Sequence, residues 1–199
     1  MPSAEFLAAI RSGGQRILEL ARSDPSRPVP QYPGWSMTDL ATHVASIHGR
    51  TTLICHDHPT ERISAPRLPE GQDVFDWYAA NLGEMLTALE ETDPEIPVWG
   101  FADSSTIAFW ERRMVVETGV HRWDAEQAFG DEMPLPEVVA AAGLDEYAGM
   151  WVPRLGDMPE IEVTATDLGR TWVFGSLAPR SEVKGTASDL YLRLMSRSS

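Results

Sequence analysis

The chain is poor in cysteine and in basic residues, and it contains no long apolar run. Its one cysteine, Cys55, has no partner for a disulfide within the chain, which agrees with a reducing compartment. The 16 lysines and arginines are outnumbered by 30 acidic residues, and the net charge of −14 argues against nucleic acid or an anionic membrane as the main partner. No stretch approaches the roughly 20 apolar residues of a membrane span, and the N-terminus lacks a basic-then-apolar signal pattern, so we expect a cytoplasmic protein.

Several catalytic motifs are missing as well. The sequence contains no Walker motif, no G-x-G-x-x-G and no visible Ser-His-Asp arrangement. Cys55 has no evident activating base, so we do not expect it to act as a nucleophile. The acidic balance does not exclude an anionic small substrate, because a few local arginines or a metal can override the global field.

What the sequence does contain is helical periodicity. Apolar residues recur at helical spacing in four stretches of comparable length, which are separated by loops rich in proline or glycine. Ser36 and Asp39 form a short capping box at the start of the second stretch. Four such helices predict a four-helix bundle, which we assign to residues 1–132. The expected helices span about 4–22, 36–55, 73–91 and 106–129.

The pattern changes after residue 132. A fifth helix is expected over 136–154, and "EIEVTATD" then alternates apolar and polar residues with a period of two. A turn at "LGR" followed by "TWVFG" predicts a hairpin, and "EVKGTA" predicts a third strand. Ser188 is the expected cap of a closing helix. Residues 133–199 are therefore predicted to form a small α+β domain, which makes the whole chain a member of the α+β class.

The expected helix over 106–129 carries an unusual polar stripe. Four polar residues follow one another at spacings of four, four and three: Arg113, Glu117, His121 and Asp124. At 3.6 residues per turn, these spacings place the side chains on one face. The second helix offers a histidine, His43, among apolar neighbours. His43, Glu117 and His121 would form a two-histidine, one-carboxylate metal site with one position open, and Asp124 could orient the His121 imidazole.

Ordinary structural explanations compete with this interpretation. An isolated Glu-x-x-x-His pair is common on helix surfaces, and a single histidine on an apolar stripe is more often a hydrogen-bonded core residue. His48 lies about 140° from His43 around the helix, so we do not expect it to join the site. The "CHDH" cluster is too tight for one helix face, and a helix C-terminus favours histidine through its dipole. Arg50 and Arg113 line either the same cavity or the solvated rim of the bundle.

Two segments taken together resemble the signature regions of one family. "PGWSMTDLATHVASIHGR" and "FWERRMVVETGVHRWDAEQAFG" are similar to the two motifs of the mycothiol-dependent maleylpyruvate isomerase family, which belongs to the DinB-like metal-binding four-helix bundles. The tail, "IEVTATDLGRTWVFG" with "EVKGTASDLYLRLMSR", resembles the family's C-terminal domain, which is likened to sterol-carrier folds. The resemblance spans nearly the whole chain. Relatives usually continue with a further strand and helix, so we expect a trimmed C-terminal domain.

The resemblance implies a ligand set and a reaction. In the family, a divalent metal, usually zinc, is held by a histidine of the first motif and by a glutamate and a histidine of the second, which fall here on His43, Glu117 and His121. It also implies mycothiol, a low-molecular-weight thiol, bound through its sulfur at the open position and deprotonated there. The thiolate would add to a double bond, allow rotation and leave, converting maleylpyruvate to fumarylpyruvate, or it would be transferred permanently to an electrophile.

The leading hypothesis is a metal-dependent, mycothiol-using enzyme, an isomerase or a thiol S-transferase, that acts on a small-molecule electrophile. Arg50 and Arg113 are the expected substrate-binding residues, because arginine matches carboxylate geometry. The alternative is a non-catalytic, metal-stabilised binding or sensor module, in which His48 or Cys55 would close the fourth position. A plain bundle without metal would leave the histidine of the second helix far from the Glu–His pair of the fourth.

Overall fold

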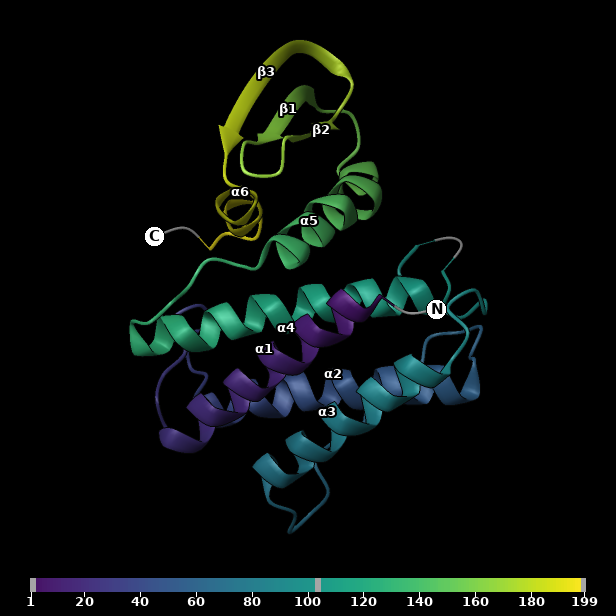
Figure 1. Cartoon of the computed structure of the whole chain (residues 1–199), viewed down its shortest axis with the longest axis vertical. Coiled ribbons are helices and arrows are strands. Elements are labelled where there is room, and N and C mark those ends of the chain that lie inside the picture. The colour runs from purple at the N-terminus through teal and green to yellow at the C-terminus, as the bar shows by residue number, and fades with distance from the viewer. Residues whose placement is uncertain (1–2, 103–104, 198–199) are drawn as a thin grey trace. The chain divides into compact units, whose positions relative to one another are not determined.

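The computed structural model describes residues 3–102 and 105–197, and the chain divides into two compact units, Met1–Met133 and Pro134–Ser199. The first unit is helical, and the second combines helices with a small three-stranded sheet (Figure 1). The predicted α+β class is therefore confirmed. Within the described ranges, no helix has both the length and the apolar composition needed to cross a membrane.

The first unit is the predicted four-helix bundle. Helices α1 and α2 both pack against α3 and α4, and they also contact each other. The helices are α1 (Ala4–Ser23), α2 (Met37–Asp57), α3 (Val74–Glu91) and α4 (Ile107–Phe129). Their apolar stripes meet in a core whose largest fully buried side chains include Trp110, Tyr78, Ile10, Ile17, Leu40 and Met85. Burial of these stripes is the main driving force for assembling the bundle.

Gly14 of α1 serves the packing against α3. A Cβ added to Gly14 would lie 2.7 Å from a methyl carbon of Leu82, so a side chain there would force Leu82 to move. The close approach also lets the buried Tyr78 hydroxyl donate a hydrogen bond of 3.0 Å to the Gly14 carbonyl oxygen. The helix therefore tolerates a residue of low helix propensity at this position because of a tertiary contact.

The second unit begins with a helix that changes its geometry along its length. Helix α5 covers Glu137–Glu146, continues as a π-helical turn over Tyr147–Trp151, and ends in a 3-10 turn over Val152–Arg154. The prediction of one regular helix over 136–154 is correct in extent and wrong in geometry. Pro153 accounts for the ending, because proline lacks the N–H that a regular helix needs and clashes with the preceding turn.

The sheet has the order β2-β1-β3. Strands β1 (Pro159–Ala165) and β2 (Arg170–Phe174) form the predicted antiparallel hairpin, with Val163 opposite Trp172. Strand β3 (Leu177–Gly185) pairs with β1 in parallel and starts earlier than the predicted "EVKGTA" stretch. An edge strand exposed along most of its length has little alternating apolar pattern, which explains why its start could not be located from the sequence.

The closing helix, α6 (Ala187–Leu194), is present, but its cap is not the predicted one. Thr186 caps the helix, since its hydroxyl oxygen accepts a hydrogen bond of 3.1 Å from the Asp189 backbone N–H. Ser188 instead accepts a hydrogen bond of 2.8 Å from the Leu135 backbone N–H, which ties α6 to the segment preceding α5. Both hydroxyls lie near the helix start, and only the tertiary contact with Leu135 decides which one acts as the cap.

Candidate metal centre

Helix α2 begins with a complete capping box, which fixes where His43 lies. The Ser36 hydroxyl accepts from the Asp39 backbone N–H, and an Asp39 carboxylate oxygen accepts from the Ser36 backbone N–H at 2.8 Å. These reciprocal bonds satisfy two donors of the first helical turn and set the helix start directly after Trp35. His43 follows about two turns into α2, on the side that faces α4.

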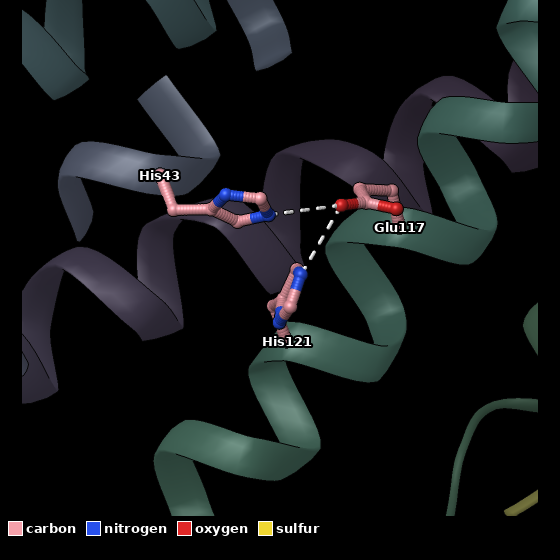
Figure 2. A group of neighbouring side chains, drawn as sticks. All are labelled: His43, Glu117 and His121. Atoms are coloured by element: carbon pink, nitrogen blue, oxygen red, sulfur yellow. Dashed lines mark hydrogen bonds and ion pairs between the residues drawn. The ribbon is translucent and has the colours of Figure 1, made fainter. Parts of the chain in front are cut away.

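The two long helices bring three of the predicted ligands together (Figure 2). His43 Nε2 lies 3.4 Å from Glu117 Oε1, and His121 Nε2 lies 3.1 Å from the same oxygen. All three donor atoms lie within 4.8 Å of one another. In the described part of the chain, no further histidine, cysteine or carboxylate joins this group.

The donor set fits a divalent metal. Donors of a tetrahedral site with bonds of about 2.0–2.2 Å lie roughly 3.3 Å apart, close to the two distances from Glu117 Oε1. Both histidines present Nε2 to the shared centre, and the carboxylate adds a hard anionic oxygen. Two imidazoles and one carboxylate leave a coordination position for a further ligand. The residues therefore match an open site more closely than a closed structural one.

Asp124 supports His121 from the opposite side of its ring. Its Oδ2 atom lies 2.9 Å from His121 Nδ1, and the Asp124 side chain is fully buried. A carboxylate at Nδ1 holds a proton there, so a metal would have to displace only the Nε2 proton to use that lone pair. Burial by itself lowers the pKa of His121, but the hydrogen bonds and charges of Asp124 and Glu117 outweigh it and raise the pKa to about 9.

Glu117 is held by partners on both of its oxygens. While Oε1 faces the two histidines, Oε2 accepts a hydrogen bond from an Arg113 guanidinium N–H. Burial would raise the pKa of Glu117, yet the Arg113 charge and the hydrogen bonds from His121 and His43 keep it well below the ordinary value. The carboxylate is thus ionised, as a metal ligand must be. The predicted substrate-binding residue Arg113 is placed by the structure against this carboxylate.

The other candidates lie apart from the triad. His48 is fully buried, with Nε2 3.0 Å from the Thr118 hydroxyl, and burial lowers its pKa to about 3. Cys55 is buried as well, and burial raises the pKa of its thiol to about 12, which makes it a poor nucleophile. Neither residue closes the metal position in the way that the binding-module alternative requires. Arg50 lies farther along α2 among aromatic rings.

Two aromatic side chains lie beside the triad. The ring of Trp35 lies 5.3 Å from the His43 ring. Tyr32, which the sequence analysis missed, stacks on Trp35 at 4.6 Å and lies 5.9 Å from the His121 ring. The sequence offered one signal, an aromatic residue three positions before Trp35. In the structure, the Val29 N–H donates a hydrogen bond to the Trp35 carbonyl oxygen, and the Tyr32 N–H donates one to the Val29 carbonyl oxygen. The two rings flank one side of the site with largely apolar surface.

Comparisons with known proteins found a matching family model and two similar solved structures. Residues 6–126 match a family model described as the mycothiol maleylpyruvate isomerase N-terminal domain. Two solved structures resemble the whole chain: crystal structures of the mycothiol-dependent maleylpyruvate isomerase and of its histidine-to-alanine mutant, with TM-scores of 0.75 and 0.76. Each is 16% identical to this chain, and each alignment covers 100% of this chain and 91% of the other. No curated protein sequence matches. The family match spans well over half of the sequence, and the chain therefore belongs to the mycothiol-dependent maleylpyruvate isomerase family.

Proposed function

We propose that this protein is a metal-dependent, mycothiol-using enzyme that activates a thiol for addition to a small-molecule electrophile. The observation that carries the proposal is the convergence of His43, Glu117 and His121 on one point, with Asp124 behind one imidazole. The family match and the names of both similar structures supply the thiol and the reaction class, cis–trans isomerisation of maleylpyruvate. Permanent transfer of the thiol to an electrophile is the related activity of the same site.

A divalent ion, with zinc the first candidate, would be held by His43, Glu117 and His121. When bound, it would supply a positive charge that favours the thiolate form of a thiol at neutral pH. The protein's own groups prepare for this role. Asp124 keeps a proton on His121 Nδ1, and Arg113 fixes Glu117 so that Oε1 faces the two imidazoles. These contacts define the site before any ligand arrives.

The remaining surroundings favour a thiol and a small electrophile over a macromolecule. Tyr32 and Trp35 flank the histidines with ring surface, which limits water on that side and suits the apolar part of a small molecule. Addition of a thiolate to one carbon of a cis double bond leaves a single bond that can rotate. Expulsion of the same thiolate then gives the trans isomer and regenerates the thiol, so the isomerase reaction consumes no cosubstrate.

The first test is metal content. Wild type and His121→Ala are purified in parallel with His56→Ala, which changes an exposed histidine of α2, and bound metals are measured by mass spectrometry. We expect near-stoichiometric divalent metal in wild type and His56→Ala, and loss of it in His121→Ala. If wild type held no metal even after reconstitution, the triad would not be a metal site.

A second test addresses the thiol. Cobalt-substituted protein is titrated with mycothiol, and the visible spectrum reports whether a sulfur atom joins the ligand set. We expect a mycothiol-dependent spectral change, followed by thiol-dependent conversion of maleylpyruvate to fumarylpyruvate in an enzyme assay. Metal without any response to thiol would contradict the enzyme proposal and favour the metal-stabilised binding or sensor module. Consumption of the thiol in proportion to product would identify a transferase.

A further inference from the structure

Arg50 occupies an unusual environment in α2. Its guanidinium carbon lies 5.4 Å from the ring centre of Trp110, 5.8 Å from that of Trp99 and 5.9 Å from that of Phe101. We refer to these three rings as the aromatic collar. Guanidinium groups at such distances are attracted to the faces of aromatic rings, and the rings also shield the charge from water. The collar therefore fixes the position of the cation without neutralising it.

Arg50 has no carboxylate partner within the described residues. It makes no ion pair or hydrogen bond there, and its Nε atom is buried without a hydrogen-bond acceptor. Its electrostatic neighbours include two further arginines, Arg62 and Arg113, while Glu117 is the acidic group that acts on it. A partly buried cation with an unused donor is unfavourable unless an anion joins it. In a chain with a net charge of −14, such a local excess of positive charge is conspicuous.

The position of Arg50 relates it to the triad. It follows His43 by seven residues, which places the two on nearly the same face of α2, about 10 Å apart along the helix axis. On α4, Trp110 precedes Glu117 by the same interval. Arg50 on α2 and Trp110 on α4 therefore lie on the two helices that carry the metal ligands, while Trp99 and Phe101 lie in the loop before α4. The electrostatic effect of Glu117 on Arg50 indicates that the guanidinium lies near the ligands. A ligand that contacts both would have to span about 10 Å.

The collar is firmly built. The Trp110 indole N–H donates a hydrogen bond of 2.6 Å to the Trp99 carbonyl oxygen, which ties the α3–α4 loop to α4. Gly100 leaves no room for a side chain, since an added Cβ would lie 2.1 Å from the Ser105 hydroxyl oxygen. Phe101 is 37% exposed, so its ring surface is accessible. An exposed large aromatic side chain beside an unpaired cation is a suitable contact for a flat anionic ligand.

We propose that Arg50 and the aromatic collar form the subsite for the carboxylate end of a flat, aromatic or aryl-conjugated electrophile. The inference rests on the proposed function and extends it, because it adds flat carboxylates that carry a ring to the electrophiles that the same site would take. The guanidinium would donate paired hydrogen bonds to the carboxylate, and the rings of Phe101 and Trp99 would contact the planar body. Arg113 does not share this role, because its guanidinium already holds Glu117.

Three unreactive or weakly reactive probes separate charge from ring contact. Trans-cinnamate carries both a carboxylate and a conjugated ring, trans-cinnamamide lacks the charge, and trans-crotonate lacks the ring. Their affinities for the metal-loaded protein are measured by isothermal titration calorimetry. We expect cinnamate to bind at least about tenfold more tightly than either of the other two, since a charged hydrogen-bond pair and ring stacking each contribute on that scale.

Matched variants then locate the subsite. Arg50→Gln should weaken cinnamate at least about tenfold, Arg50→Lys should weaken it less, and Phe101→Leu should reduce the preference for cinnamate over crotonate. Arg11→Gln, which removes an exposed arginine of α1, should leave the affinity unchanged. Thermal unfolding of each variant checks folding, and Arg50→Lys still tests the subsite if Arg50→Gln does not fold. His121→Ala should retain cinnamate binding, because the subsite does not include the metal.

Specific outcomes would overturn the inference. Failure of wild type to bind cinnamate, or equal affinity of wild type and the folded Arg50 variants, would show that Arg50 anchors no carboxylate. Loss of cinnamate binding in His121→Ala with no effect at Arg50 would assign the carboxylate to the metal. If crotonate bound as tightly as cinnamate, the rings of the aromatic collar would make no contribution to binding. Metal content and the thiol response of Arg50→Gln remain those of wild type in every one of these cases, so the proposed function is tested separately.

Discussion

Two largely buried glutamates of helix α4, Glu117 and Glu126, have partners of different kinds. Glu126 lies 3.5 Å from the Arg16 Nε atom and 3.5 Å from an Arg122 Nη atom, and its side chain is only 5% exposed. Glu117, 11% exposed, directs one oxygen to two imidazoles and only the other to an arginine. The partners of Glu126 are two permanent cations, whereas Glu117 also faces two imidazoles, which can lose their protons.

The difference in partners distinguishes Glu126, which joins two helices, from Glu117, which can bind a metal. Guanidinium groups have no lone pair to offer a metal and stay charged at any relevant pH, so the Glu126 cluster can only join α1 to α4. Imidazoles offer a lone pair once they are neutral, so the same kind of carboxylate at Glu117 can exchange its hydrogen bonds for a shared cation.

The largest effect is expected for Glu117→Gln. Glutamine keeps the shape and can still contact both histidines, but it removes the anionic ligand. Divalent-metal affinity should fall by more than about 100-fold, since changes to the groups that merely hold a ligand already cost about 10–100-fold. Competition with a chromophoric chelator measures this affinity. An unchanged value would remove Glu117 from the ligand set.

Asp124→Asn tests the support behind His121. The amide can still accept from Nδ1, but without the negative charge it holds that proton less firmly. Metal affinity should fall by about 10–100-fold while the fold is retained. The matched control is Asp131→Asn, a change at an exposed aspartate beyond α4 that should leave the affinity unaltered. An effect of equal size in both variants would point to net charge rather than to the contact with His121.

His48 provides the pH dependence. Its pKa in the folded protein is about 3, below the ordinary 6.5, so its contribution to stability is complete above pH 6.5 and is lost as the pH falls toward 3. Between pH 7.5 and pH 5.0, the unfolding free energy of wild type should decrease by about 2 kcal/mol more than that of His48→Gln. Denaturant titrations in the presence of a chelator measure both. Parallel pH profiles would show that His48 accepts a proton within the fold.

Glu126→Gln is the counterpart of the Glu117 variant. It weakens the contacts with Arg16 and Arg122 and should lower the unfolding free energy by about 1–2 kcal/mol. Metal affinity should change by no more than about twofold, because the two glutamates share no described partner. Chemical denaturation and the chelator competition provide the two readouts. A large loss of metal would mean that the two regions are coupled through α4.

The smallest effect is expected for Arg113→Met. Methionine fills similar space but releases Glu117 Oε2, so metal affinity should fall by about threefold to tenfold, the low end for groups that orient a ligand. Arg50→Gln should instead weaken carboxylate binding and leave the bound metal unchanged. The two variants therefore distinguish an arginine that orients a metal ligand from one that binds substrate. If Arg113 binds substrate directly, its removal would leave metal affinity unchanged and raise the KM for the electrophile.

Much of the candidate site could be predicted from local sequence. Arg113, Glu117, His121 and Asp124 share one helix, and helical periodicity alone determines that residues three or four apart are neighbours. The capping box at Ser36 and Asp39 and the start of α2 were predicted for the same reason. His43 was chosen as the third ligand from its place among apolar residues and then from the family resemblance, but local periodicity could not bring it to the Glu–His pair, because α2 and α4 are far apart in the sequence.

Local sequence is enough to specify the set of helices, the β1–β2 hairpin and the polar stripe of α4, since each depends on neighbours within a few residues. The remaining features depend on the packing of distant segments. It assigned Arg113 to Glu117, placed Trp99 and Phe101 around Arg50, gave the α6 cap to Thr186, and paired β3 in parallel with β1. The physical reason is that side chains such as arginine, serine and tryptophan have several adequate partners, and only the packing of distant segments selects one.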